Sequence, residues 1–160
     1  MLNRGEIRVA IIGTGHVGLV TAAIFAERGF KVMALDHDKD KVDMINRGKA
    51  PYFEANLDEI VEKVVATGML KAVLDREKAV KSSNICFIAV GTPSLPDGSA
   101  DLRYVKAVAA DIGEALKDKD EYTLVVARST VVPGIQQGML FCLSLKRILV
   151  KRLGEILVYV

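Results

Sequence analysis

Three glycines in the motif Gly13-Thr14-Gly15-His16-Val17-Gly18 come directly after the apolar segment 7–12. A strand, a glycine-rich turn and a helix in this order form the site that holds a dinucleotide pyrophosphate. The first glycine permits a tight turn, the second lets the backbone approach the phosphates, and the third lets the helix pack closely on the strand. Unpaired N–H groups at the start of the helix attract the anion. The motif therefore predicts a dinucleotide site.

An acidic residue supports this interpretation. Residues 31–35 read as a second strand, and Asp36 follows its last residue. An acid about 20 residues beyond the glycines, at the carboxyl end of a strand, binds the adenosine ribose hydroxyls. It favours NAD over NADP, whose 2′-phosphate usually meets an arginine. A methyltransferase with Asp36 on the ribose of S-adenosylmethionine stays open as an alternative.

The rest of the chain alternates between strand and helix patterns. Strands are predicted at 7–12, 31–35, 70–74, 84–90 and 122–127, and helices at 17–28, 39–46, 57–67, 76–81 and 104–116. This alternation predicts an α/β fold of the Rossmann type, a doubly wound parallel sheet with right-handed crossovers. Ligands bind beyond the carboxyl ends of such strands. The glycine loop, Asp36, residues 91–93 and residues 129–130 should therefore converge on one crevice.

Charge and cysteine content exclude several classes of protein. A net charge of +2 argues against a nucleic-acid-binding surface. No apolar run approaches the roughly 18 residues of a membrane span. The two cysteines make no disulfide framework, and Cys86 lies in an apolar run typical of a core strand. We expect a cytoplasmic protein with no membrane or nucleic-acid partner and no metal site.

Further motifs follow the glycine loop in a specific order. They are residues 51–57 (Pro-Tyr-Phe-Glu with Leu57), 90–93 (Val-Gly-Thr-Pro), 97–101 (Asp-Gly-Ser-Ala-Asp) and 129–134 (Ser-Thr-Val-Val-Pro-Gly). Together they are far more specific than a glycine loop alone. On these motifs, residues 8–134 resemble the N-terminal NAD domain of the UDP-glucose/GDP-mannose dehydrogenase family.

The resemblance implies a function. That family oxidises the C6 alcohol of a nucleotide sugar to a carboxylate in two NAD-dependent hydride transfers, with covalent cysteine intermediates between them. Neither Cys86 nor Cys142 matches the catalytic cysteine motif, so no nucleophile is assigned. We expect a chain truncated before the family's central helix and C-terminal substrate domain, and inactive on its own. A non-catalytic NAD-binding or regulatory module stays open, as does a homodimer.

The resemblance also implies the site residues. The NAD contacts would be Gly13, Gly15, His16, Val17, Gly18, Asp36, Lys41, Val90, Gly91, Thr92 and Thr130. Asp36 and Lys41 would hold the adenosine ribose, and Thr92 would face the cofactor from a strand end. Thr130 carries the one catalytic role implied, because its hydroxyl would orient water or substrate near the nicotinamide.

Residues 135–160 depart from the pattern. This segment holds four cations, Lys146, Arg147, Lys151 and Arg152, against the one acid Glu155. We therefore divide the chain into an NAD-binding Rossmann domain, 1–134, and an atypical tail, 135–160. Codons for the tail, read in a frame displaced by one base, can spell TTGNAILPLLEKNSGKKAGRDFGVC, which continues the family pattern. The hypothesis is an out-of-frame tail, and a natural divergent helix is the alternative.

Overall fold

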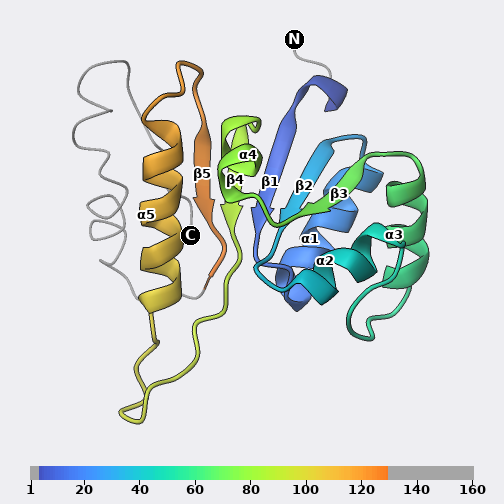
Figure 1. The fold of residues 1–160 in the computed structure, drawn as a ribbon. Coiled ribbons are helices and arrows are strands. Elements are labelled where there is room, and N and C mark those ends of the chain that lie inside the picture. Colours follow the sequence, from blue (N-terminus) through green and yellow to red (C-terminus); the bar gives the residue numbers. More distant parts are fainter. Residues whose placement is uncertain (1–3, 130–160) are drawn as a thin grey trace.

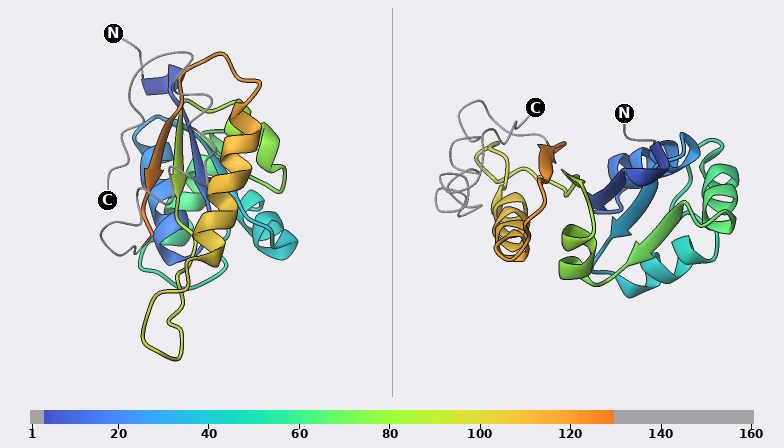
Figure 2. Two further views of the ribbon diagram at one scale, coloured as in Figure 1. Left: turned by 90° about the vertical axis from the view of Figure 1, so that its left-hand side faces the viewer. Right: turned by 90° about the horizontal axis from the view of Figure 1, so that it is seen from above.

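A five-stranded parallel sheet lies between two layers of helices in the computed structural model, which describes residues 4–129 (Figures 1 and 2). The elements are η1 (Arg4–Glu6), β1 (Arg8–Ile12), α1 (His16–Glu27), β2 (Lys31–Leu35), α2 (Lys39–Asn46), α3 (Leu57–Ala66), β3 (Leu70–Val73), α4 (Arg76–Lys81), β4 (Ile85–Ile88), α5 (Arg103–Leu116) and β5 (Leu124–Ala127). The predicted doubly wound α/β fold is confirmed. The short 3-10 helix η1 was not predicted.

The sheet order β3-β2-β1-β4-β5 places β1 in the centre. Residues Val9–Ile12 pair with β2 on one side and with β4 on the other, so each of these residues has a partner in both neighbouring strands. The chain builds outward from β1 to β3, returns across the sheet, and builds outward again from β4 to β5. Strand order therefore reverses between β1 and β4, and such a switch point is where open α/β sheets bind ligands.

Each face of the sheet has its own apolar core. Val9 and Ile11 of β1 pack with α1 and α3, whereas Ala10 and Ile12 pack with α4 and α5 on the opposite face. This division follows from the alternation of side chains along a strand. Because both faces of β1 are covered, all four of these residues are buried.

The strand β4 corrects one expectation. Its apolar run predicted a strand buried on both faces over 84–90, but the strand covers only Ile85–Ile88. Cys86 and Ile88 are buried, whereas Ile85 and Phe87 on the other face are half-buried. The helix α1 lies mainly over β1 and β2, which leaves this face of β4 less covered. Burial also raises the pKa of the Cys86 thiol to about 12, so Cys86 is no candidate nucleophile.

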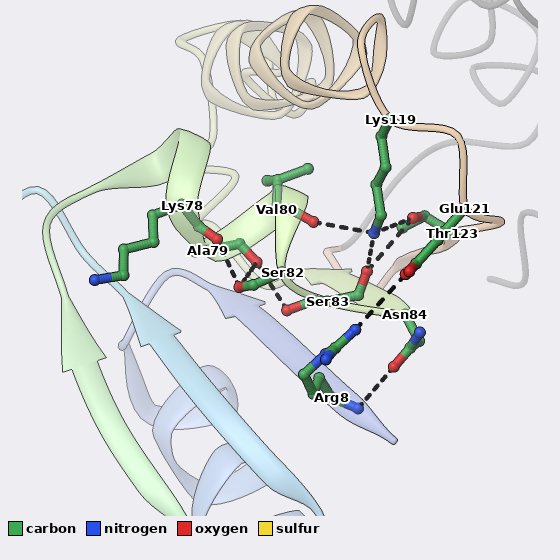
Figure 3. A network of polar contacts seen from close by, with 10 residues as sticks. All are labelled: Arg8, Lys78, Ala79, Val80, Ser82, Ser83, Asn84, Lys119, Glu121 and Thr123. Atoms are coloured by element: carbon green, nitrogen blue, oxygen red, sulfur yellow. Dashed lines mark hydrogen bonds and ion pairs between the residues drawn. The ribbon is translucent and has the colours of Figure 1, made fainter. Parts of the chain in front are cut away.

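A polar network closes the amino end of the sheet, away from the carboxyl ends (Figure 3). The Lys119 ammonium donates to the Ser83 carbonyl and, at 2.7 Å, to Thr123 Oγ1. Beside it, the Arg8 backbone N–H donates to Asn84 Oδ1 at 3.0 Å, and the Arg8 guanidinium pairs with Glu121 at 3.6 Å. Burial lowers the pKa of Lys119. The network joins the chain before β4 to the chain before β5.

Replacing Lys119 by methionine should destabilise the fold by about 1–3 kcal/mol, because buried acceptors lose their charged donor. The measurement is the free energy of unfolding in urea. Lys117→Met is the matched control, because the Lys117 side chain pairs with Glu114 on the surface of the described part of the chain. It should leave stability unchanged within error, since exposed pairs contribute little. Equal losses in the two variants would contradict the structural role of the network.

Within the described part of the chain, no helix is both long and apolar enough to span a membrane. Over residues 4–129, His, Cys, Asp and Glu side chains also form no group of three or more that could hold a metal ion.

Candidate dinucleotide site at the carboxyl ends of the strands

The glycine loop has room for glycine alone at two of its three glycine positions. Gly13 has φ of +100°, and a Cβ there would lie 2.8 Å from the Ala89 carbonyl oxygen. A Cβ on Gly18 would lie 1.9 Å from the Gly13 carbonyl oxygen. At Gly15, in contrast, no described atom beyond the two neighbouring residues lies within 4 Å of an added Cβ. Gly13 and Gly18 therefore shape the loop, and Gly15 leaves its surface open.

The start of α1 faces solvent at this open surface. Gly15 is the N-cap residue, and no side chain of the described residues caps the helix there, whereas Asp38 caps α2 and Asp75 caps α4. Gly15, His16 and Val17 are all exposed. Uncapped N–H groups at a helix start attract an anion. The loop thus has the shape and the donors that a dinucleotide pyrophosphate needs.

The carboxylate of Asp36 is held against the same loop. Its side chain is buried, and its Oδ2 accepts hydrogen bonds from Thr14 N at 2.9 Å and from Thr14 Oγ1 at 2.5 Å. Its Oδ1 accepts one from Asp38 N at 3.1 Å. Burial alone would raise the pKa of Asp36, but the hydrogen bonds of Thr14 and Asp38 and the charge of Lys41 outweigh it and lower the pKa. The group is therefore ionised at neutral pH.

Lys41 lies on α2, half-buried, and acts on Asp36 through its charge. His37, the next residue after Asp36, has a side chain that is 93% exposed, with Nδ1 3.2 Å from Asp36 Oδ1. The charge of Lys41 thus acts on Asp36, and its contact with the ribose stays a prediction.

The chain after β4 lies beside the glycine loop. Ala89 N donates to the Ile12 carbonyl at 2.8 Å, just as Gly13 N donates to the Leu35 carbonyl at 2.8 Å. Val90 and Thr92 are half-buried, and Gly91 is exposed. The ends of β2, β1 and β4 therefore form one continuous edge, which carries Asp36, the glycine loop and residues 90–92.

The end of β5 joins the same edge. Ser129 is buried, and its hydroxyl donates to the Val90 carbonyl at 2.7 Å. The four strand ends that the sequence analysis singled out are thus neighbours. Thr130, the predicted catalytic residue, lies outside the described residues, as do the remainder of its motif and Cys142.

The motif at 97–101 shapes its own loop, which projects from the carboxyl edge of the sheet (Figure 1). Asp97 accepts hydrogen bonds from the Ser99 backbone and hydroxyl, and Gly98 between them has φ of +82°. Asp101 is buried and pairs with Arg103 at the start of α5. These contacts explain why a turn needs Asp and Gly here.

Tyr52 is a residue whose role sequence reasoning missed. Its hydroxyl donates to the Gly15 carbonyl at 2.6 Å, and its ring lies 3.9 Å from the His16 ring, centroid to centroid. His16 Nδ1 lies 3.9 Å from Glu54 Oε2. Burial, helped by the charge of Glu54, raises the pKa of Tyr52, which keeps the hydroxyl protonated as a donor. The loop after α2 therefore fastens the glycine loop from outside.

Removal of the Tyr52 hydroxyl, in Tyr52→Phe, should weaken NADH binding about three- to tenfold, because Gly15 loses an external hydrogen bond. NADH fluorescence on titration measures this effect. Tyr104→Phe, which removes an exposed hydroxyl on α5, is the matched control and should bind as the wild type does. Identical affinities for Tyr52→Phe and wild type would show that the glycine loop keeps its shape without this contact.

Comparison with known proteins gives a consistent result. The family model for the NAD-binding domain of UDP-glucose/GDP-mannose dehydrogenases matches residues 7–153. The chain is 42% identical over 128 residues to a GDP-mannose 6-dehydrogenase of Pseudomonas aeruginosa, covering 80% of this chain and 29% of that protein. It is 44% identical over 127 residues to a UDP-glucose 6-dehydrogenase of Bacillus subtilis, covering 79% of this chain and 27% of that one.

Solved structures show the same similarity. A ternary complex of GDP-mannose dehydrogenase from Pseudomonas aeruginosa superposes with a TM-score of 0.83 at 38% identity, covering 86% of this chain and 33% of the other. The chain thus spans less than a third of the length of the curated relatives described above.

Proposed function

The chain belongs to the UDP-glucose/GDP-mannose dehydrogenase family as its NAD-binding domain, and from this premise we propose which of its residues hold the cofactor. The observation that carries the proposal is one shared edge. The uncapped start of α1 and the ionised carboxylate of Asp36 lie there side by side, joined through Thr14. These are the two features that a pyrophosphate and an adenosine ribose require.

Each residue at this edge has a proposed role. Backbone N–H groups of Gly15, His16 and Val17 bind the pyrophosphate, and Gly13 and Gly18 give the loop its shape. Asp36 accepts a hydrogen bond from the adenosine ribose, and Lys41, whose charge acts on Asp36, is its proposed partner there. Val90, Gly91 and Thr92 line the side of the site toward β4. For Thr130 we retain the role implied by the family resemblance, orienting water or substrate near the nicotinamide.

The proposal for the whole reaction rests on the similarity of this chain to longer dehydrogenases. Bound NAD supplies a hydride acceptor, and the chain's own residues fix where that acceptor lies. The relatives named above act on GDP-mannose or UDP-glucose, and identities of 42% and 44% do not separate the two. We propose that this domain serves the oxidation of a nucleotide-sugar C6 alcohol, the class of substrate that both share. A cytoplasmic location and a homodimer are part of the same proposal.

The division of the chain at Gly134 stays a proposal, and so does the displaced reading frame of residues 135–160. The alignments with the two relatives named above cover 128 and 127 residues, whereas the family model extends to residue 153. Sequencing the gene across the codons for Gly134 and Ile135 decides the question. A single added or missing base there supports the displaced frame, and an intact frame in register with Ile135 contradicts it.

Calorimetric titration of the full 160-residue chain with NAD and with NADP tests the assignment of Asp36. NAD should bind more tightly, because the ionised Asp36 accepts a ribose hydrogen bond from NAD and repels the 2′-phosphate of NADP. Equal or tighter binding of NADP would contradict this role of Asp36.

A further inference from the structure

Thr14 occupies an unusual place in the glycine loop. It lies between the two glycines that shape and open the loop, yet its side chain is fully buried. Its hydroxyl and its backbone N–H both donate to one oxygen of Asp36, Oδ2. Two donors from a single residue fix both the position and the rotation of that carboxylate. Thr14 thus links the segment proposed for the pyrophosphate to the acid proposed for the ribose.

The hydrogen-bonding capacity of Asp36 shows what this arrangement leaves free. An ionised carboxylate has about four acceptor positions, two on each oxygen. Thr14 takes both positions on Oδ2, and Asp38 N takes one on Oδ1. The His37 ring, 93% exposed, lies beside Oδ1 with its Nδ1 3.2 Å away. Among the described residues, only this exposed ring stands at the remaining acceptor position on Oδ1, so a ligand that displaces it can bind there.

We propose that the Thr14 hydroxyl is the positioning group for ribose recognition, because it turns Asp36 so that a single oxygen, Oδ1, is offered to the ribose 2′-hydroxyl. The proposal rests on the proposed function and deepens it. Thr14 itself touches no cofactor, since its side chain is buried behind the loop. Without the hydroxyl, Oδ2 would keep only one donor, and the carboxylate would be free to rotate away from the ribose.

The test uses a substitution of matched shape and a ligand that lacks one hydroxyl. Thr14→Val removes the donor and keeps the branched side chain. The ligand 2′-deoxy-NAD, here the analogue without the 2′-hydroxyl of the adenosine ribose, lacks the group that Asp36 would bind. Calorimetry on the full chain should show NAD binding weakened about tenfold in Thr14→Val. Binding of 2′-deoxy-NAD should be unchanged, so the preference for NAD over its deoxy analogue should nearly disappear.

Two variants control for damage to the loop. Thr14→Ser keeps the hydroxyl and should retain the wild-type preference. Thr21→Val removes a threonine hydroxyl from α1, where it bonds to the Val17 carbonyl, and should also retain it. A Thr14→Val protein that loses NAD and 2′-deoxy-NAD affinity equally, or neither, overturns the proposal. If Thr14→Val does not fold, Thr14→Ala makes the same comparison without the added methyl group. Failure of both to fold also overturns it, since Thr14 would then serve folding.

The wild-type protein separates this proposal from the proposed function. A wild type that binds NAD no better than 2′-deoxy-NAD contradicts the role of Asp36 itself. The other outcome is that the wild type prefers NAD and the Thr14→Val variant keeps the same preference. The role of Asp36 then stands, and only the positioning role of Thr14 is contradicted.

Discussion

Gly18→Ala is expected to abolish measurable NAD binding and to destabilise the fold. The added Cβ would lie 1.9 Å from the Gly13 carbonyl oxygen, a distance that forces the backbone apart. Gly13 cannot yield freely, because its N–H is bonded to Leu35 and its own Cβ position is closed by Ala89. Overpacking of this kind costs about 1–3 kcal/mol or more. An ordinary glycine inside a helix would instead gain roughly 0.5–1 kcal/mol on replacement by alanine.

Gly15→Ala is the matched control for that variant. No described atom beyond the two neighbouring residues lies within 4 Å of a Cβ at Gly15, so the fold should keep its wild-type stability. NAD affinity should still fall, because the methyl group would stand where the phosphates approach the backbone. Urea denaturation and NADH fluorescence, measured on both variants, separate the two effects. A stable Gly18→Ala protein with normal NAD affinity would contradict the close approach of α1 to β1.

Asp36→Asn is expected to weaken NAD binding by about 1.5–3 kcal/mol, the worth of a charge-assisted hydrogen bond, or roughly ten- to hundredfold. NADP should gain relative to NAD, because the repulsion of its 2′-phosphate disappears. Asp43→Asn is the matched control: its pKa is also lowered, by Lys39, but its pairing lies on the surface of α2. It should bind NAD as the wild type does. An unchanged ratio of NAD to NADP affinity in Asp36→Asn would remove Asp36 from ribose recognition.

Most of the fold was predictable because it follows from local patterns. The helices α2 and α4 begin and end where the sequence predicts, and Asp38 and Asp75 cap their first turns. The strands β4 and β5 were predicted too long, since an apolar run does not show where the hydrogen-bonded ladder begins and ends. The strand β4 ends at Ile88, and the next residue, Ala89, still donates its N–H to the Ile12 carbonyl before the chain leaves the sheet.

The position of one proposed site residue was predictable from a strand end. An acid directly after β2 is expected beside the glycine loop, and Asp36 lies there, bonded to Thr14. Thr14 and Tyr52 were missed because their contacts join residues 22 and 37 positions apart. In the sequence, Thr14 is an ordinary loop residue. The pairing of β1 with β2 in the structure places it beside Asp36. The contact of Tyr52 with Gly15 depends on the path of the loop between α2 and α3, and no sequence periodicity predicts that path.

A crystal structure of the full chain with NAD is the most direct test of the account. We expect the pyrophosphate within hydrogen-bond distance of the Gly15, His16 and Val17 amides, and the ribose 2′-hydroxyl on Asp36 Oδ1, with Thr14 still bonded to Oδ2. NAD bound away from the start of α1, or an adenosine ribose that makes no contact with Asp36, would contradict it.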